Sequence, residues 1–281
     1  MRLRLIVGAL GTLLAVSADV AADGYIPQPS AKDMGVPAPI PVPAPIPVQE
    51  GFTYYFRGDL GYGWSGDKSF SESGAEYDGL LGTITSAGIP FSVRTDNTFL
   101  GTVGIGAYFT PRIRGDLTID FRGDQETVAT GNYTPAGPAV TGTVVDSLKV
   151  RSTVALANIY FEPLPRGMFS PYVGAGIGFV YQDITRTYTN SEFDIAGDPV
   201  GATRTGNGKD NTAGLAAALM AGMTFAVDHR WAVDVGYRAM FLDGVDSKAR
   251  IVPSTPAQVS TASLSSNWEH QVRVGLRFNI W

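Results

Sequence analysis

The sequence predicts an all-β fold, an eight-stranded antiparallel up-and-down barrel that crosses a membrane. Three observations predict it. Apolar and polar residues alternate with a period of two from Thr53 onward, short and long gaps alternate between the resulting runs, and aromatic residues gather at both ends of the runs. Such alternation is typical of strands that have two different faces.

The clearest run is 113–122, where Ile113, Leu117 and Phe121 share one face while Arg114 and Asp120 share the other. A tilted strand of about 9–11 residues crosses a bilayer. For 148–162 the sequence does not decide which face of the strand points outward. Val154 and Leu156 would place the apolar face at even-numbered positions, and Ile159 and Phe161 would place it at odd-numbered positions. Eight runs are long enough to cross: 54–64, 98–109, 113–122, 148–162, 170–182, 212–226, 231–241 and 268–280.

The gaps between the runs predict the topology. Three are short, at 110–112, 163–168 and 227–230. Four are long and rich in Gly, Ser, Thr, Asp and Asn, at 65–97, 125–147, 183–211 and 243–267. Bacterial outer-membrane barrels have short periplasmic turns and long extracellular loops. We therefore expect the short gaps to be periplasmic turns and the long ones extracellular loops.

The aromatic residues indicate two interfacial belts, as amphipathic rings favour lipid–water boundaries. The run ends near the short gaps hold Tyr54, Phe56, Phe109, Phe161, Phe169, Tyr172, Phe225, Trp231, Phe278 and Trp281. The opposite ends hold Tyr62, Trp64, Phe99, Phe121, Tyr181, Phe241 and Trp268. The uncharged stretch 212–227 is too short for a membrane helix and fits a barrel strand.

The N-terminus predicts export. Arg2 and Arg4 precede an apolar run that is too short to span a bilayer as a helix, and small residues follow it. We interpret residues 1–22 as a signal peptide, cleaved after Ala22 or, alternatively, after Ala18. Residues 23–50, with proline at alternate positions from 37 to 47, predict an extended periplasmic linker. The barrel is assigned to residues 51–281.

The composition excludes several functions. Cysteine is absent, so a disulfide framework, a thiol nucleophile and a cysteine zinc site are excluded. The formal net charge is −5, which disfavours nucleic acid as a partner. No pattern predicts a catalytic residue, a cofactor or a metal site. The two histidines are far apart in the sequence, and His270 has only Ser266 near it as a nucleophile of matching parity.

Parity places an almost balanced set of charges inside the barrel, where the interior of eight strands is just wide enough for side chains. We predict that these residues form a structural network, because a buried charge needs a partner. A narrow selective pore is the alternative. The set comprises Arg57, Asp59, Arg114, Asp116, Asp120, Arg122, Asp234, Arg238, Glu269, Arg273 and Arg277.

Three Arg-Gly-Asp tripeptides occur, at 57–59, 114–116 and 122–124. The first two lie inside predicted strands, with Arg and Asp facing the lumen. Only the copy at 122–124 sits beside a predicted outer loop, where an adhesive role is the alternative to repeated strand chemistry. The glycine-rich stretch 174–178 lacks the loop–helix context and the Lys-Ser/Thr of a phosphate-binding loop.

The opening strand 54–63 (YYFRGDLGYG), together with 172–178 (YVGAGIG), 234–238 (DVGYR) and 272–278 (VRVGLRF), resembles the small outer-membrane β-barrel surface antigens of alphaproteobacteria, of the OmpA-like or opacity type. The resemblance implies a non-enzymatic role in envelope integrity or surface adhesion through the extracellular loops. A narrow porin or a haem or small-ligand receptor is the alternative, and a lipid A-modifying hydrolase is a further one.

The resemblance also implies a location and partners. The chain is expected in the cell outer membrane, in contact with membrane lipid and lipopolysaccharide. The outer-membrane assembly machinery would recognise its C-terminus, Phe278, Ile280 and Trp281, although the last aromatic falls one residue beyond the outward phase. A host or surface ligand would bind at the loops.

Overall fold

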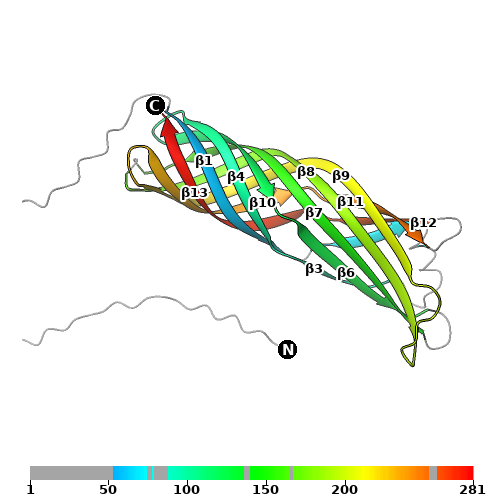
Figure 1. The fold of residues 1–281 in the computed structure, drawn as a ribbon. Helices are drawn as coiled ribbons and strands as arrows, with labels where there is room; N and C mark the ends of the chain where they lie inside the picture. The colour runs from blue at the N-terminus through cyan, green and yellow to red at the C-terminus, as the bar shows by residue number, and fades with distance from the viewer. Residues whose placement is uncertain are drawn as a thin grey trace, which may run out of the picture. The chain divides into compact units, whose positions relative to one another are not determined.

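The computed structural model describes residues 53–66, 68–74, 78, 88–135, 140–164, 167–252 and 258–280. These ranges form one antiparallel 13-stranded sheet (Figure 1). The predicted signal peptide, the predicted linker and Trp281 lie outside the described residues.

A closed ring of eight strands forms the barrel, as the sequence predicts. The closing pair is β1 with β13, where Tyr54 lies opposite Ile280 and Ser65 lies opposite Glu269. Closure leaves this part of the sheet without an unpaired edge. In ring order the strands are β1 (Thr53–Ser65), β4 (Thr98–Tyr108), β5 (Ile113–Arg122), β7 (Val140–Phe161), β8 (Phe169–Asp194), β9 (Arg204–Ala226), β10 (Trp231–Leu242) and β13 (Asn267–Ile280).

The short gaps lie between β4 and β5, between β7 and β8, and between β9 and β10. The first and the last are tight turns, and the second includes residues outside the described ranges. The last is held by Asp228, whose Oδ1 accepts the backbone N–H groups of Arg230 at 2.6 Å and Trp231 at 2.8 Å. We call this end of the barrel the turn end.

The outward face of the ring is apolar and exposed. Leu60 is 75% exposed, Phe179 69% and Ile177 68%. Such a continuous apolar wall is the surface that lipid covers. In β7 the even-numbered residues face inward, so Val154 and Leu156 lie in the lumen, which decides the facing that the sequence left open.

The stretch 212–226 belongs to strand β9, as predicted. Within the described ranges, no helix has the length and apolar character needed to cross a membrane.

The four long gaps are not loops throughout, which corrects the sequence prediction. They contain β2 (Phe70–Gly74), β3 (Phe91–Thr95), β6 (Gln125–Tyr133), β11 (Val245–Val252) and β12 (Gln258–Leu264), and β7, β8 and β9 run on beyond the barrel. We call these five strands, with 140–150, 183–194 and 204–211, the extension. Its strands were missed because polar residues that also occur in loops, such as Thr, Ser, Asn and Asp, occupy many of their water-facing positions.

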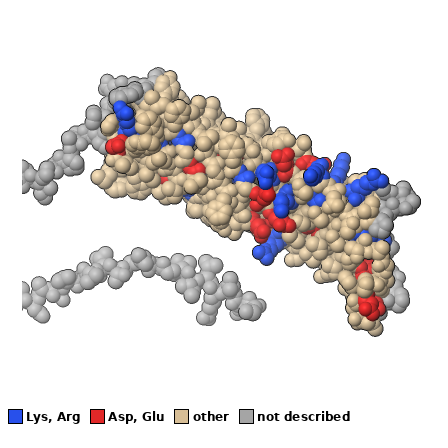
Figure 2. All heavy atoms as spheres, in the orientation of Figure 1, with Lys and Arg blue, Asp and Glu red and all other residues tan. Residues whose placement is uncertain are grey.

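In the extension, apolar side chains face inward and polar side chains face outward, which is the reverse of the barrel. The buried apolar residues of the extension form two clusters: one contains Leu148, Ile184 and Leu264, and the other contains Tyr133, Val144, Tyr188 and Ile251. Exposed charges such as Lys149 and Arg151 begin where the apolar wall ends. Figure 2 shows Lys, Arg, Asp and Glu side chains gathered in a band across the molecule. The extension is therefore built for water, and the barrel for lipid.

We predict that Leu148→Ala loosens the extension and leaves the barrel intact. Leu148 is fully buried, and truncating such a leucine costs about 2–5 kcal/mol. Amide hydrogen exchange should accelerate in residues 140–150 and stay slow in 153–161. The neighbouring Lys149→Ala, on the exposed face, is the control and should change neither segment. Unchanged exchange in Leu148→Ala would contradict the presence of a packed core.

Candidate functional site

The structure places all eleven predicted charges inside the barrel, where each makes at least one polar contact with another inward group. Arg114 and Asp120 are fully buried, and Arg57 and Arg273 are the most accessible, with side chains 7% and 10% exposed. We call this set, with Glu162, the lumen network. It fills the barrel from the turn end to the outer belt.

At the turn end the network centres on Arg114 of β5. Its Nε donates to Glu162 Oε1 at 2.8 Å, and its guanidinium carbon lies 3.8 Å from the centroid of the Tyr160 ring. The Tyr55 and Tyr172 rings flank the same guanidinium at 5.8 and 5.0 Å. An arginine on aromatic faces gains cation–π attraction that strengthens away from water.

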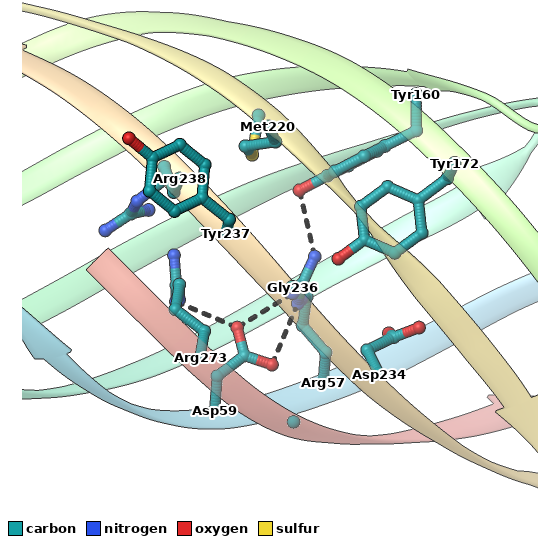
Figure 3. A pocket seen from close by; sticks show the side chains of 11 residues that line it. Arg57, Asp59, Tyr160, Tyr172, Met220, Asp234, Gly236, Tyr237, Arg238 and Arg273 are labelled. Carbon is teal, nitrogen blue, oxygen red and sulfur yellow. Dashed lines mark hydrogen bonds and ion pairs between the residues drawn. The ribbon is translucent and has the colours of Figure 1, made fainter. Parts of the chain in front are cut away.

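Asp59 connects two arginines in the middle of the barrel (Figure 3). Its Oδ2 lies 2.8 Å from Arg57 Nη2 and 2.9 Å from Arg273 Nη2. Arg57 in turn donates through Nη1 to Asp116 Oδ2 and to the Tyr160 hydroxyl, both at 2.9 Å. The four strands β1, β5, β7 and β13 are thereby joined across the lumen.

In the half of the barrel nearer the extension, acidic and basic side chains of the network also lie next to one another. Asp120 accepts hydrogen bonds from Arg238 and from Thr102, and Arg273 lies 3.6 Å from its Oδ1. Glu269 pairs with Arg122 across the barrel. Charge-assisted contacts of this kind are the strong class of hydrogen bond.

The network leaves little empty space. A cavity of about 20 Å³ lies among Arg57, Asp59, Tyr160 and Asp234, and one of about 30 Å³ lies at the outer end near Lys68 and Glu269. Each has room for only a few waters at most. Between these two cavities, the described part of the lumen is filled by the buried side chains of the network.

Sequence reasoning missed several members of this site. Glu162 ends the predicted run 148–162, whose facing the sequence left open, so it was not counted among the inward charges, yet its side chain is buried in the lumen. Tyr172 was predicted for the lipid-facing belt, and that prediction is wrong, because the side chain is 7% exposed and packs against Tyr160 in the lumen. Parity within 169–182 would have identified it, since Ile177 and Phe179 face outward.

A second buried charge cluster lies in the extension, where the sequence predicted loops. Arg186 of β8 is fully buried and pairs with Asp146 of β7 and, at 3.2 Å, with Glu72 of β2. It also donates to the carbonyls of Ser247 at 3.2 Å and Ser260 at 2.8 Å. One guanidinium therefore ties five strands together.

The electrostatics of this cluster are unbalanced, with two carboxylates around one cation. Burial raises the pKa of the Glu72 carboxyl to about 7, against the lowering influence of Ser260 and Arg186. Burial likewise raises the pKa of Asp146, opposed by its hydrogen bonds from Arg186. Among the described residues, Glu72 Oε2 has no hydrogen-bond partner.

The remaining motifs are separated from these clusters. Arg122 of the third Arg-Gly-Asp tripeptide is buried against Glu269, so this tripeptide is not displayed as a unit, and Asp124 pairs with Arg151 at 2.8 Å instead. His229 is exposed in the β9–β10 turn, and His270 faces outward from β13. In the ranges that the structure covers, no group of three or more His, Cys, Asp or Glu side chains could hold a metal ion.

The C-terminal residues named as an assembly signal end strand β13. Phe278 packs against Trp231 with ring centroids 4.7 Å apart, and Ile280 lies opposite Tyr54. These contacts place the end of the chain in the aromatic belt at the turn end. Recognition by assembly machinery stays a prediction.

Comparisons with known proteins agree with this architecture. A family model described as "Outer membrane protein beta-barrel domain" matches residues 42–278. An uncharacterized protein of Brucella suis biovar 1 is 28% identical over 294 residues, covering 95% of each chain, and one of Brucella abortus (strain 2308) matches equally. Among solved structures, OprG of Pseudomonas aeruginosa aligns with a TM-score of 0.42 and 15% identity, covering 81% of this chain and 95% of OprG.

We predict that Asp120→Ala strongly destabilises the barrel, because it leaves Arg238 and Arg273 without their shared carboxylate in a buried site. Removing one partner of a buried pair costs about 3–5 kcal/mol. Urea unfolding of protein refolded in lipid vesicles, followed by tryptophan fluorescence, measures the change. The control is Asp124→Ala, which removes an exposed ion pair and should leave the midpoint unchanged. Equal midpoints in both variants would refute a stabilising role for the network.

We also predict a pH dependence that originates at Glu72. The pKa in the folded state, about 7, lies above the ordinary value of 4.5, so the folded state holds this proton more tightly than the unfolded state. The stabilising contribution is full below about pH 4.5 and is lost as the pH rises through 7.

The neutral variant Glu72→Gln isolates this effect. Its melting temperature, relative to that of the wild type, should rise between pH 5 and pH 8, because only the wild type acquires the buried charge. Thermal scans at four pH values across this range would show the trend. If the difference in melting temperature between the variant and the wild type stays constant with pH, Glu72 is not the source of the pH dependence.

Proposed function

The chain belongs to the family of outer membrane protein beta-barrel domains, and from this premise we propose that it is a structural, non-conducting barrel that displays its extension for contacts outside the cell. Its location is the cell outer membrane. With short turns on the periplasmic side, the extension stands on the extracellular side.

The filled lumen is the single observation that carries this proposal. Oppositely charged side chains alternate along the interior, and two cavities between them are only about 20 and 30 Å³. Opening a path for ions would separate buried ion pairs, each costly to break. An interior packed with ion pairs favours the role of a rigid scaffold over that of a pore.

The extension supports the second half of the proposal, surface contact. The turn joining β8 and β9 presents Ile195 at 88% exposure. Asp194 Oδ1 accepts the N–H groups of Ala196 and Asp198, both at 2.9 Å, and Gly197 has a φ of +88°, which fixes the turn. A preorganised apolar residue is an effective anchor for a partner, because little ordering is required on binding.

The partners that we propose follow from this orientation. The apolar wall contacts membrane lipid and lipopolysaccharide, the terminal strand contacts the assembly machinery, and the tip of the β8–β9 hairpin contacts a host or surface ligand. No catalytic step is required for any of these roles.

We predict that the purified protein in planar bilayers shows no steady conductance steps. The physical reason is the occupied lumen. A parallel measurement on Asp120→Ala, in which the network is interrupted, should show only brief openings above the wild-type baseline. Regular wild-type steps would overturn the non-conducting proposal and favour a transport role.

We further predict that Ile195→Ser reduces attachment of bacteria expressing the protein to epithelial monolayers by severalfold. The loss follows from removing the exposed apolar anchor. Val252→Ser, at an exposed apolar position of β11, is the matched control. Attachment that is equal for the wild type, for both variants and for cells without the protein would argue against adhesion through this tip.

A further inference from the structure

His270 lies in a cluster of three rings on the outer wall of the barrel. On one side its ring stacks on Tyr237 of β10, with centroids 5.9 Å apart and an interplanar angle of 22°. On the other side lies Trp64 of β1, at 6.1 Å. Three adjacent strands, β1, β13 and β10, therefore position the cluster.

The cluster lies at the outer boundary of the apolar wall. Trp268, the next outward residue of β13 toward the extension, packs against Phe241 at 5.7 Å. Val272, the next in the other direction, begins the aliphatic part of the wall and is 50% exposed. His270 thus sits where the hydrocarbon of the outer leaflet meets its headgroups.

Hydrogen bonding gives the imidazole a defined direction. The Tyr237 hydroxyl and His270 Nδ1 are bonded to each other, and neither group has another partner among the described residues. In the tautomer that the proposal below uses, the Tyr237 hydroxyl donates to Nδ1 and the imidazole proton is on Nε2. That N–H points away from Tyr237, and in the described ranges no protein group accepts it.

An unmatched N–H at a membrane surface requires an acceptor, since leaving it bare in an apolar medium is costly. Among the described residues, neither a carboxylate nor a serine is hydrogen-bonded to the ring, so the arrangement fits binding rather than hydrolysis. The molecules that reach this surface are outer-leaflet lipids, whose headgroups carry phosphate oxygens. Flat aromatic faces beside the donor suit the apolar face of a sugar ring.

We propose that Trp64, Tyr237 and His270 form a binding site for the phosphorylated glucosamine headgroup of lipid A. His270 Nε2 donates to a phosphate oxygen, and the Trp64 and Tyr237 rings lie against the sugar. The inference rests on the outer-membrane location and is independent of whether the lumen conducts, so its failure would leave the proposed function untouched.

The chain has only two histidines, which makes the test direct. Full-length mature protein labelled with 15N-histidine is placed in phosphatidylglycerol nanodiscs and titrated with diphosphoryl lipid A. The imidazole signal of His270 should shift and saturate, while that of His229, in the turn on the opposite side of the membrane, should stay fixed. No shift, or equal shifts of both histidines, would overturn the proposal.

The chemistry of the ligand is tested by a second titration, with lipid A from which both phosphates have been removed. This lipid should give at most a tenth of the affinity of the diphosphoryl form. Equal affinity would show that the phosphate is not the acceptor, and the proposal would be wrong.

Variants test the residues by native mass spectrometry of protein with bound diphosphoryl lipid A. His270→Phe keeps a ring and removes the donor, and Tyr237→Phe removes the group that orients it, so each should lower affinity about tenfold. His270→Gln keeps an N–H donor and should recover most of the loss. His229→Gln is the control. Heated and unheated gel migration confirms that each variant folds, and unchanged affinity in folded His270→Phe would overturn the site.

Discussion

The structure depends on charge neutralisation inside a closed ring. Eight strands leave an interior that side chains just fill, so every inward charge must find its partner within the lumen and not in water. Six arginines, at 57, 114, 122, 238, 273 and 277, meet six carboxylates there, those of Asp59, Asp116, Asp120, Asp234, Glu162 and Glu269. Some of the pairs link non-adjacent strands, as Arg122 with Glu269 and Arg238 with Asp120 do, and so brace the cylinder from within.

The same strands serve two solvents. In β7, Ile159 and Phe161 face lipid while Asn158 and Tyr160 face the lumen, and ten residues earlier Leu148 faces inward while Lys149 faces water. The backbone geometry is continuous, because inter-strand hydrogen bonds are independent of which face is apolar. What changes at the boundary is the chemistry of each face. This change lets one hairpin be both a membrane wall and a soluble sheet.

The sequence was sufficient to predict the barrel, its short turns and its inward charges, because period-two alternation and parity act on neighbouring residues. It was insufficient for the extension, since strands with Thr, Ser and Asn at water-facing positions resemble loops when the partner strand is unknown. The cluster around Arg186 could not be predicted for a related reason. Glu72, Asp146 and Arg186 are brought together only by the pairing of β2 with β12 and of β7 with β8.

A filled interior determines where recognition can occur. When the lumen has no room for a ligand, specificity must reside on outward surfaces, and the chain has two that differ in kind. One is the rigid tip around Ile195, far along the β8–β9 hairpin, and the other is the ring cluster of Trp64, Tyr237 and His270 at the lipid boundary. Both are held by the rigid barrel, so the lumen network contributes to binding only by keeping these surfaces in place.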